Sequence, residues 1–304
     1  MKVVLFCGGL GTRLRDMASA LPKPMVNIGY RPILWHIMKY YAHYGHKDFI
    51  LCLGYKAEVI KQFFLNYDQC LSSDFTLSNG SKQVHLKESD ISDWKVTFVD
   101  TGLSSNVGQR LKAVEKYLTN EEYFLANYAD ALTDLHLPDE IERLKQSDKI
   151  ACFVCVKPSQ SFSVVSMREE DCVEKINFVR NTDIRINGGY FVFRREIFNY
   201  MNDGEELVVE PFSRLIKEKK LLGYVYDKFW HCMDTFKEQQ ELNDMFEHGT
   251  APWEVWKNGK AAARSRCHRF LPISGETHPD CYFNSDVYSY SDAHSAGTSN
   301  KLEH

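Results

Sequence analysis

Short apolar runs alternate with amphipathic segments from the first residues of this 304-residue chain, and this alternation restricts the possible folds most strongly. The apolar runs are rich in Val, Ile, Phe and Leu, as strands buried on both faces should be. They span residues 2–7, 48–54, 95–100, 122–128 and 149–157. Strand–helix alternation of this kind predicts a doubly wound α/β fold with a mostly parallel sheet.

Three of the intervening segments have the amphipathic pattern of helices. In segment 31–45, RPILWHIMKYYAHYG, Pro32 suits a first helical turn and Gly45 suits the end of the helix. Segments 55–67 and 108–118 repeat the pattern. We therefore expect helices in all three places.

Composition excludes several classes of protein. The formal net charge of -4 gives no overall basic surface for nucleic acid. No apolar run approaches the roughly 20 residues of a membrane span, and the first apolar run is too brief for a signal peptide. With 44% hydrophobic residues the chain can bury a large core. We expect a cytoplasmic protein that binds neither membranes nor nucleic acid.

The cysteines favour a structural interpretation. Of the nine, Cys7, Cys52, Cys152 and Cys155 lie in apolar runs, which predicts buried free thiols in a reducing compartment. Cys152 and Cys155 have the C-x-x-C spacing of metal and redox sites. On a strand, however, residues three apart point to opposite faces, and no second C-x-x-C completes a zinc site.

Two segments depart from the alternation. Residues 68–94 are polar, and Asn79-Gly80 lies between two alternating arms, which predicts a β-hairpin inserted into a domain that spans residues 1–257. Residues 258–304 lack a helical or strand period and predict an irregular tail. Its final Leu-Glu-His resembles the start of an expression tag.

The segment CGGLGTRLRDMASALPKPMV, residues 7–26, follows the first predicted strand directly. In an open α/β sheet, ligands bind at the carboxyl ends of strands, and the first strand–helix loop often holds an anion. The loop contains three glycines and two cations suited to phosphate, namely Gly8, Gly9, Gly11, Arg13 and Lys23. Leu14 stands where a dinucleotide-binding loop has its last glycine, and no Gly-Lys-Ser/Thr follows, so the loop fits neither common phosphate-binding pattern.

These residues carry a family resemblance. GGLGTRL and PKPMVNIGYRPIL resemble the signature of sugar-phosphate nucleotidyltransferases, and the similarity continues through VTFVDTGLSSNVGQRLKAV, INGGYFVF, FWHCMDT and GTAPWEVW. It covers roughly residues 1–257 and implies a Rossmann-like nucleotidyltransferase fold. The hairpin insertion and the VDTG segment are most similar to the cytidylyltransferase branch that acts on glucose 1-phosphate. The resemblance implies transfer of a nucleotidyl group from CTP, or another NTP, to a sugar 1-phosphate.

The resemblance also implies a set of site residues. The implied catalytic residues are Arg13, Lys23 and Arg110. The implied nucleotide-binding residues are Gly8, Gly9, Gly11, Thr12, Arg13, Lys23, Ser104 and Gly108. Asp130 and Asp234 are implied to hold one Mg²⁺, whose preferred ligands are oxygens, and Asp130 directly follows an apolar strand. An aspartate in such a place can instead be a helix N-cap, as Asp134 can.

For the phosphorylated acceptor, the resemblance implies binding by Glu174, Lys175, Gly188 and Gly189. The chain departs from the family pattern close to these residues. Ile176 replaces the proline of Glu-Lys-Pro, Ser163 replaces a glycine, and Ala129 replaces the glycine before the metal aspartate. These changes leave nucleotidyl transfer in place and leave open which phosphorylated acceptor is used.

Several alternatives remain open at the level of sequence. The enzyme could use another NTP or a non-glucose acceptor, or the chain could be an inactive nucleotide-binding regulatory protein. In the predicted hairpin, Phe75, Leu77, Val84 and Leu86 alternate with polar residues and form one apolar face. The domain itself could cover this face. The resemblance implies a homo-oligomer in which the hairpin lies at an interface.

Overall fold

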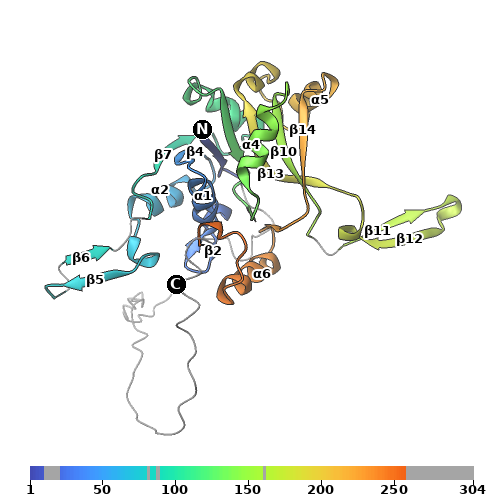
Figure 1. The fold of residues 1–304 in the computed structure, drawn as a ribbon. Coiled ribbons are helices and arrows are strands. Elements are labelled where there is room, and N and C mark those ends of the chain that lie inside the picture. The colour runs from blue at the N-terminus through green and yellow to red at the C-terminus, as the bar shows by residue number, and fades with distance from the viewer. Residues whose placement is uncertain (10–20, 81–82, 87–89, 160–161, 258–304) are drawn as a thin grey trace, which may run out of the picture. The chain divides into compact units, whose positions relative to one another are not determined.

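The computed structural model describes residues 1–9, 21–80, 83–86, 90–159 and 162–257. Its centre is a seven-stranded sheet in the order β14-β10-β13-β8-β1-β4-β7, of which β13 alone runs antiparallel to the others (Figure 1). The strands are β1 (Val3–Phe6), β4 (Asp48–Leu53), β7 (Lys95–Asp100), β8 (Tyr123–Asn127), β10 (Ala151–Val156), β13 (Ile186–Arg194) and β14 (Leu221–Tyr226). The predicted mostly parallel α/β sheet is confirmed, and all five predicted strands form.

Helices connect these strands on both faces of the sheet. They are α1 (Ile33–His43), α2 (Ala57–Leu65), α3 (Val107–Ala113), α4 (Leu137–Lys145), α5 (Glu210–Lys217) and α6 (Phe236–Glu247). Pro32 is the N-cap of α1, and Gly45 follows its end with a φ of +85°, in the region that glycine favours. The third helix is shorter than predicted, because a separate 3₁₀ turn at Glu115–Tyr117 follows it.

Two apolar cores lie on the two faces of the sheet. Alternate residues of β1 enter different cores, with Val3 and Leu5 in one and Val4 and Phe6 in the other. The first core includes side chains from α1, α2 and α4, and the second includes side chains from α3 and α5. This arrangement is the doubly wound packing that the alternation predicts.

Short two-stranded sheets supplement the main one. They are β2 (Asn27–Ile28) with β3 (Arg31–Pro32), β5 (Phe75–Ser78) with β6 (Gln83–Leu86), β9 (Ala131–Thr133) with β15 (Trp230–Cys232), and β11 (Ser163–Met167) with β12 (Val173–Phe178). The pair β5–β6 is the predicted hairpin, and Asn79 and Gly80 after β5 have φ values of 52° and 62°. Figure 1 shows β5–β6 and β11–β12 as separate two-stranded ribbons.

A buried polar network ties the base of the hairpin insertion to the domain. Arg31 is 1% exposed, and its guanidinium donates to Ser72 Oγ and to the Asp68 carbonyl. Asp90 accepts from Ser72 Oγ at 2.6 Å and from Lys39 Nζ at 2.9 Å. These contacts hold both ends of the insertion against the start of α1.

The described cysteines agree with the predicted free thiols. Cys7, Cys52 and Cys152 are buried and unpaired, while Cys155 is half-buried. Cys152 belongs to the first core, and Cys155 has the opposite parity along β10, so the two thiols point to opposite faces. Among the described residues, no helix has the length and apolar character that a membrane span requires.

One buried acid lacks a partner. Glu140 of α4 is 0% exposed, and neither carboxylate oxygen has a hydrogen-bond partner among the described residues. Burial raises the pKa of Glu140 well above its usual range. The folded protein therefore keeps this proton to a higher pH than the unfolded chain, and ionisation of the unfolded chain favours unfolding as the pH rises above ~4.3.

We predict that Glu140→Met makes the protein more stable at neutral pH. The difference in free energy of unfolding between the variant and the wild type should widen with pH, by up to about 1.4 kcal/mol per unit above ~4.3. Urea unfolding at pH 5, 6 and 7 measures it. Glu142→Met is the matched control, because Glu142 is exposed on the same helix and accepts from the Gln146 side chain. Equal pH dependence of wild type and Glu140→Met would contradict the prediction.

Candidate active site

The loop after β1 begins against a buried arginine. A Cβ on Gly8 would lie 2.0 Å from Arg110 Nη1, so only glycine fits beside the guanidinium. Gly54, after β4, is similarly restricted, since its Cβ would lie 2.7 Å from the Gly8 carbonyl oxygen. The role of Gly8 in the structure is therefore close packing against Arg110.

Arg110 on α3 is 4% exposed and binds the ends of three neighbouring strands. Its Nη2 donates to the Gly8 carbonyl at 3.0 Å, and its Nη1 donates to the Leu53 carbonyl at 3.1 Å. Nη1 also donates to Thr101 Oγ1 at 2.7 Å and to the Gly102 carbonyl at 2.9 Å. These bonds connect β1, β4 and the loop after β7, so this geometry supports positioning of the loops rather than direct phosphate contact.

Lys23 lies in a 3₁₀ turn, Lys23–Met25, between two prolines that restrict its backbone. Its side chain is 13% exposed, and Nζ donates to Asp130 Oδ2 at 2.8 Å. Nζ also donates to Asp234 Oδ1. Burial alone would lower the pKa of Lys23, but Asp130 and Asp234 outweigh it and raise this pKa above its usual range.

Asp130 follows β8 at a sharp turn. Ala129, immediately before it, has a φ of 62°, a left-handed conformation that costs a non-glycine residue roughly 1–2 kcal/mol. Asn127 stabilises the turn, because its Oδ1 accepts from the Ala129 N–H at 2.7 Å. The family glycine that Ala129 replaces would adopt the same conformation without this cost.

Asp234 follows β15, which pairs with β9 so that Cys232 lies opposite Ala131. The Met233 N–H donates to the Asp130 carbonyl at 2.9 Å, which ties the two aspartate turns together. Glu238 at the start of α6 accepts from the Asp234 N–H at 2.8 Å. Two carboxylates about a hundred residues apart in sequence are thereby fixed around one cation.

This pair of carboxylates fits a divalent ion. Asp130 and Asp234 are 28% and 26% exposed, and both reach a single positive group, the Lys23 ammonium. Hard oxygen ligands of this kind are those that Mg²⁺ prefers, with phosphate oxygens and water completing its shell. Among the described residues, no group of three or more His, Cys, Asp or Glu side chains offers an all-protein metal site.

The remaining residues predicted to bind nucleotide are placed differently. Gly11, Thr12 and Arg13 lie outside the described residues. Gly9 and Ser104 are exposed in the loops next to Arg110. Gly108 is buried, and a Cβ there would lie 2.2 Å from the Glu205 carbonyl oxygen, so this glycine packs against the 205–207 backbone.

The predicted acceptor residues fall into two groups. Gly188 and Gly189 lie in β13, where the pairing with β10 shifts, and the Gly188 carbonyl accepts from Trp230 Nε1 at 2.8 Å. Glu174 and Lys175 lie on β12, where both are exposed, and Glu174 Oε1 accepts from Arg168 at 2.9 Å. In the contacts of the described residues, neither meets the aspartate pair, so an acceptor role for these two stays a prediction.

Glu238 and Asn127 were not anticipated from the sequence. Both support a candidate metal aspartate through backbone hydrogen bonds. Thr235 and Glu238 form a capping box at the start of α6, and the Thr-x-x-Glu spacing is a readable signal for it. Glu238 goes further than capping, because it also accepts from the Asp234 backbone. Asp134, a possible cap, instead accepts from the Tyr226 hydroxyl.

The thiols near the site do not supply a nucleophile. Burial raises the pKa of Cys52 and of Cys232, each to about 12. Burial also raises the pKa of Cys7 well above its usual range. A thiolate is the reactive form of cysteine, so these three favour structural roles.

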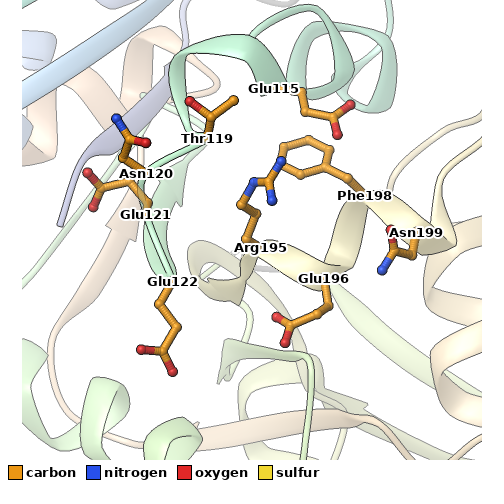
Figure 2. A pocket seen from close by; sticks show the side chains of 9 residues that line it. All are labelled: Glu115, Thr119, Asn120, Glu121, Glu122, Arg195, Glu196, Phe198 and Asn199. Atoms are coloured by element: carbon orange, nitrogen blue, oxygen red, sulfur yellow. The ribbon is translucent and has the colours of Figure 1, made fainter.

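A separate pocket of about 380 Å³ lies at the opposite edge of the sheet (Figure 2). Its residues precede β8 or follow the antiparallel β13, so they gather at the amino ends of the parallel strands. They are Glu115, Thr119, Asn120, Glu121, Glu122, Arg195, Glu196, Phe198 and Asn199. Four carboxylates around one guanidinium would repel a nucleoside triphosphate. The carboxyl edge, with Lys23 and the aspartate pair, is therefore the candidate active site.

A doubly wound sheet with a cation and paired carboxylates at its carboxyl edge defines an α/β protein suited to phosphorylated ligands. The Nucleotidyl transferase family matches residues 2–247, and the chain belongs to this family. It is thus a nucleotidyltransferase, as the sequence motifs predict.

Individual relatives agree with this assignment. The chain is 38% identical over 259 residues to glucose-1-phosphate cytidylyltransferase of Salmonella typhimurium, covering 84% of this chain and all of that protein. It is 27% identical to D-glycero-alpha-D-manno-heptose 1-phosphate guanylyltransferase of Campylobacter jejuni, over 76% of this chain and 93% of that protein. The structure of HddC from Yersinia pseudotuberculosis complexed with GMP-PN has the same fold, with a TM-score of 0.58, 21% identity, and coverage of 81% of this chain and 99% of that one.

We predict that Arg110→Met destabilises the fold by about 2–4 kcal/mol, since it leaves buried carbonyl groups without a donor. Thermal and urea unfolding measure the loss. Lys112→Met on the same helix is the control. Lys112 is half-buried, pairs with Glu115 and lies over the Phe198 ring, and none of these contacts is to a buried carbonyl group. An Arg110→Met protein with wild-type stability and no activity would instead support the phosphate contact that the resemblance implies.

Proposed function

We propose that this enzyme transfers a cytidylyl group from CTP to glucose 1-phosphate, forming CDP-glucose and releasing pyrophosphate. The observation that carries the proposal is the convergence of Asp130 and Asp234 on Lys23 at the carboxyl edge of the sheet. The choice of CTP and glucose is supported by the similarity to the Salmonella cytidylyltransferase over its whole length.

In this reaction, a phosphate oxygen of the sugar phosphate attacks the α-phosphorus of CTP. The bond from the α-phosphorus to the bridging oxygen of pyrophosphate breaks, and pyrophosphate leaves. Both reactants are anions, so the protein must mainly align them and neutralise their charge. The side chains required are cations and oxygen ligands for a metal, and Lys23 with the aspartate pair at the carboxyl edge supports this requirement.

Asp130 and Asp234 would hold Mg²⁺, which neutralises phosphate charge when bound. Lys23 is the described cation next to them and would contact phosphate oxygens of the substrates. Arg13 remains the predicted partner of the triphosphate. Arg110 contributes indirectly, because it fixes the loops that begin at Gly8 and Thr101.

The acceptor would bind close to β13, as the resemblance implies. Gly188 and Gly189 are themselves buried there, against Trp230 and Tyr128. Gly189 has a φ of 76°, which glycine adopts without strain. Glu174 and Lys175 are proposed as further acceptor contacts.

A matrix of the four common NTPs against a panel of sugar 1-phosphates, with Mg²⁺, tests the proposal by pyrophosphate release. The CTP–glucose 1-phosphate pair should give the highest kcat/KM. A different best pair would replace the proposed base or sugar. Nucleotide binding without pyrophosphate release from any pair would support the alternative of an inactive regulatory protein.

We predict that Asp130→Asn lowers kcat about a hundredfold or more, because it removes one negative charge from the proposed metal site. Circular dichroism should show an unchanged fold. Asp139→Asn, at an exposed position on α4, is the control and should retain wild-type turnover. Full activity of Asp130→Asn, or of the wild type in EDTA, would exclude the assigned metal role.

We also propose a homo-oligomer whose interface includes the β5–β6 hairpin. In this hairpin, Phe75 pairs with Leu86 and Leu77 with Val84, so the four lie on one face. Phe75 and Leu86 are 40% and 39% exposed, and Leu77 and Val84 are 50% and 49% exposed. The described part of the domain therefore leaves this apolar face exposed to solvent. A two-stranded hairpin is marginally stable alone in water, so a second subunit is the proposed cover.

We predict that light scattering gives a mass above that of one 35.3 kDa chain. Leu77→Glu with Val84→Glu should yield smaller species, as should deletion of residues 70–92. The pair Thr76→Glu and His85→Glu is the matched control, since these residues are paired on the other face of the same hairpin. A wild-type monomer at micromolar concentration with full activity would refute the oligomer.

We place the enzyme in the cytoplasm. The proposal is supported by Cys7, Cys52, Cys152 and Cys155, which are free thiols, as is usual in reducing compartments. Its substrates, a nucleoside triphosphate and a sugar phosphate, are also intracellular compounds.

A further inference from the structure

Lys23 occupies the space between two carboxylates that the proposed function assigns to a metal. Its Nζ is 2.8 Å from Asp130 Oδ2 and in direct contact with Asp234 Oδ1. Each contact occupies one oxygen lone pair on each carboxylate, at the place where the two aspartates converge. A single ion bound by both aspartates would need this same position, so the ammonium and the ion compete for it.

Charge makes simultaneous occupation unfavourable. A lysine and a divalent ion together would place three positive charges on two carboxylates, within a few ångströms of one another. The backbone of Lys23 is held between Pro22 and Pro24, but its four-carbon side chain has several rotatable bonds. Displacement would thus be a movement of the side chain alone.

We propose that Lys23 holds the metal's place in the free enzyme and leaves it when the metal–nucleotide complex binds. The inference rests on the proposed function, because the arriving phosphates are the new partners of the ammonium. It gives Lys23 a second role, as a cation that keeps Asp130 and Asp234 together before substrate arrives. Metal alone should bind weakly. Nucleotide should strengthen metal binding, because both ligands favour the same conformation of the protein, in which the Lys23 side chain has moved away from the aspartates.

The test measures Mn²⁺ binding to the full-length protein without nucleotide, by electron paramagnetic resonance of the free ion. Lys23→Met should bind Mn²⁺ at least about tenfold more tightly than the wild type, because the competing charge is gone. Lys47→Met is the matched control. It loses the same charge, but Lys47 pairs with Asp93 on the surface, and its Mn²⁺ affinity should equal that of the wild type.

Thermal unfolding gives a second measurement. Without Lys23 the two carboxylates repel each other, so Lys23→Met should have a lower Tm than the wild type in EDTA. Mg²⁺ should raise the Tm of Lys23→Met substantially and change that of the wild type little. Lys23→Gln, whose amide can still donate a hydrogen bond, serves as the second variant. Its Tm in EDTA should lie between those of the wild type and Lys23→Met.

Mn²⁺ affinity of Lys23→Met and Lys23→Gln that equals or falls below that of the wild type would overturn the proposal. Tightening in Lys47→Met of the same size would also overturn it, because the effect would then reflect overall charge. Neither measurement includes CTP or a sugar phosphate. A failure of the proposed substrates in turnover assays is therefore distinguishable from a failure of the displacement.

Discussion

The carboxyl edge of the sheet depends on one buried guanidinium. Arg110 donates to the carbonyl oxygens of Gly8, Leu53 and Gly102, which lie at the ends of three neighbouring strands. Such close approach is possible because Gly8 and Gly54 carry no side chains. The first loop of the site thus starts at Gly8, a backbone position that Arg110 fixes from a helix about a hundred residues later in the chain.

The aspartate pair of the site, Asp130 and Asp234, is held in place by a short strand pairing rather than by Arg110. A ladder of three residues in each strand, β9 with β15, brings the turns of Asp130 and Asp234 together. Each turn has its own buried support, from Asn127 in one case and Glu238 in the other. Because the strained Ala129 is stabilised locally, the aspartate can leave its strand at a sharp angle without a glycine before it.

The sequence predicted those helices and strands that are long enough to show a hydrophobic period. The buried strands and the inserted hairpin follow from pattern, whereas the grouping of Lys23, Asp130 and Asp234 in one site follows from the family resemblance. The burial of Arg110 could not be predicted. The local sequence around a helical arginine does not show whether its guanidinium is exposed to solvent or donates to buried carbonyl groups. The β9–β15 ladder is too short for a period of two to be visible. The exposure of Glu174 and Lys175 depends on tertiary placement of their ribbon, which local pattern does not encode.

The charges of Lys23 and of the aspartate pair determine together which ligands the site can bind. Asp130, Asp234 and Lys23 sum to one negative charge, and a nucleoside triphosphate alone would be repelled by it. Under the proposed function, a divalent ion on the carboxylates would make this sum positive and would free the ammonium to face phosphate. The proposed metal site would thereby favour the metal complex of the nucleotide over the bare nucleotide. Arg110 takes no direct part in this charge balance, since its donors are directed at carbonyls and a hydroxyl, and its contribution is to fix the loops.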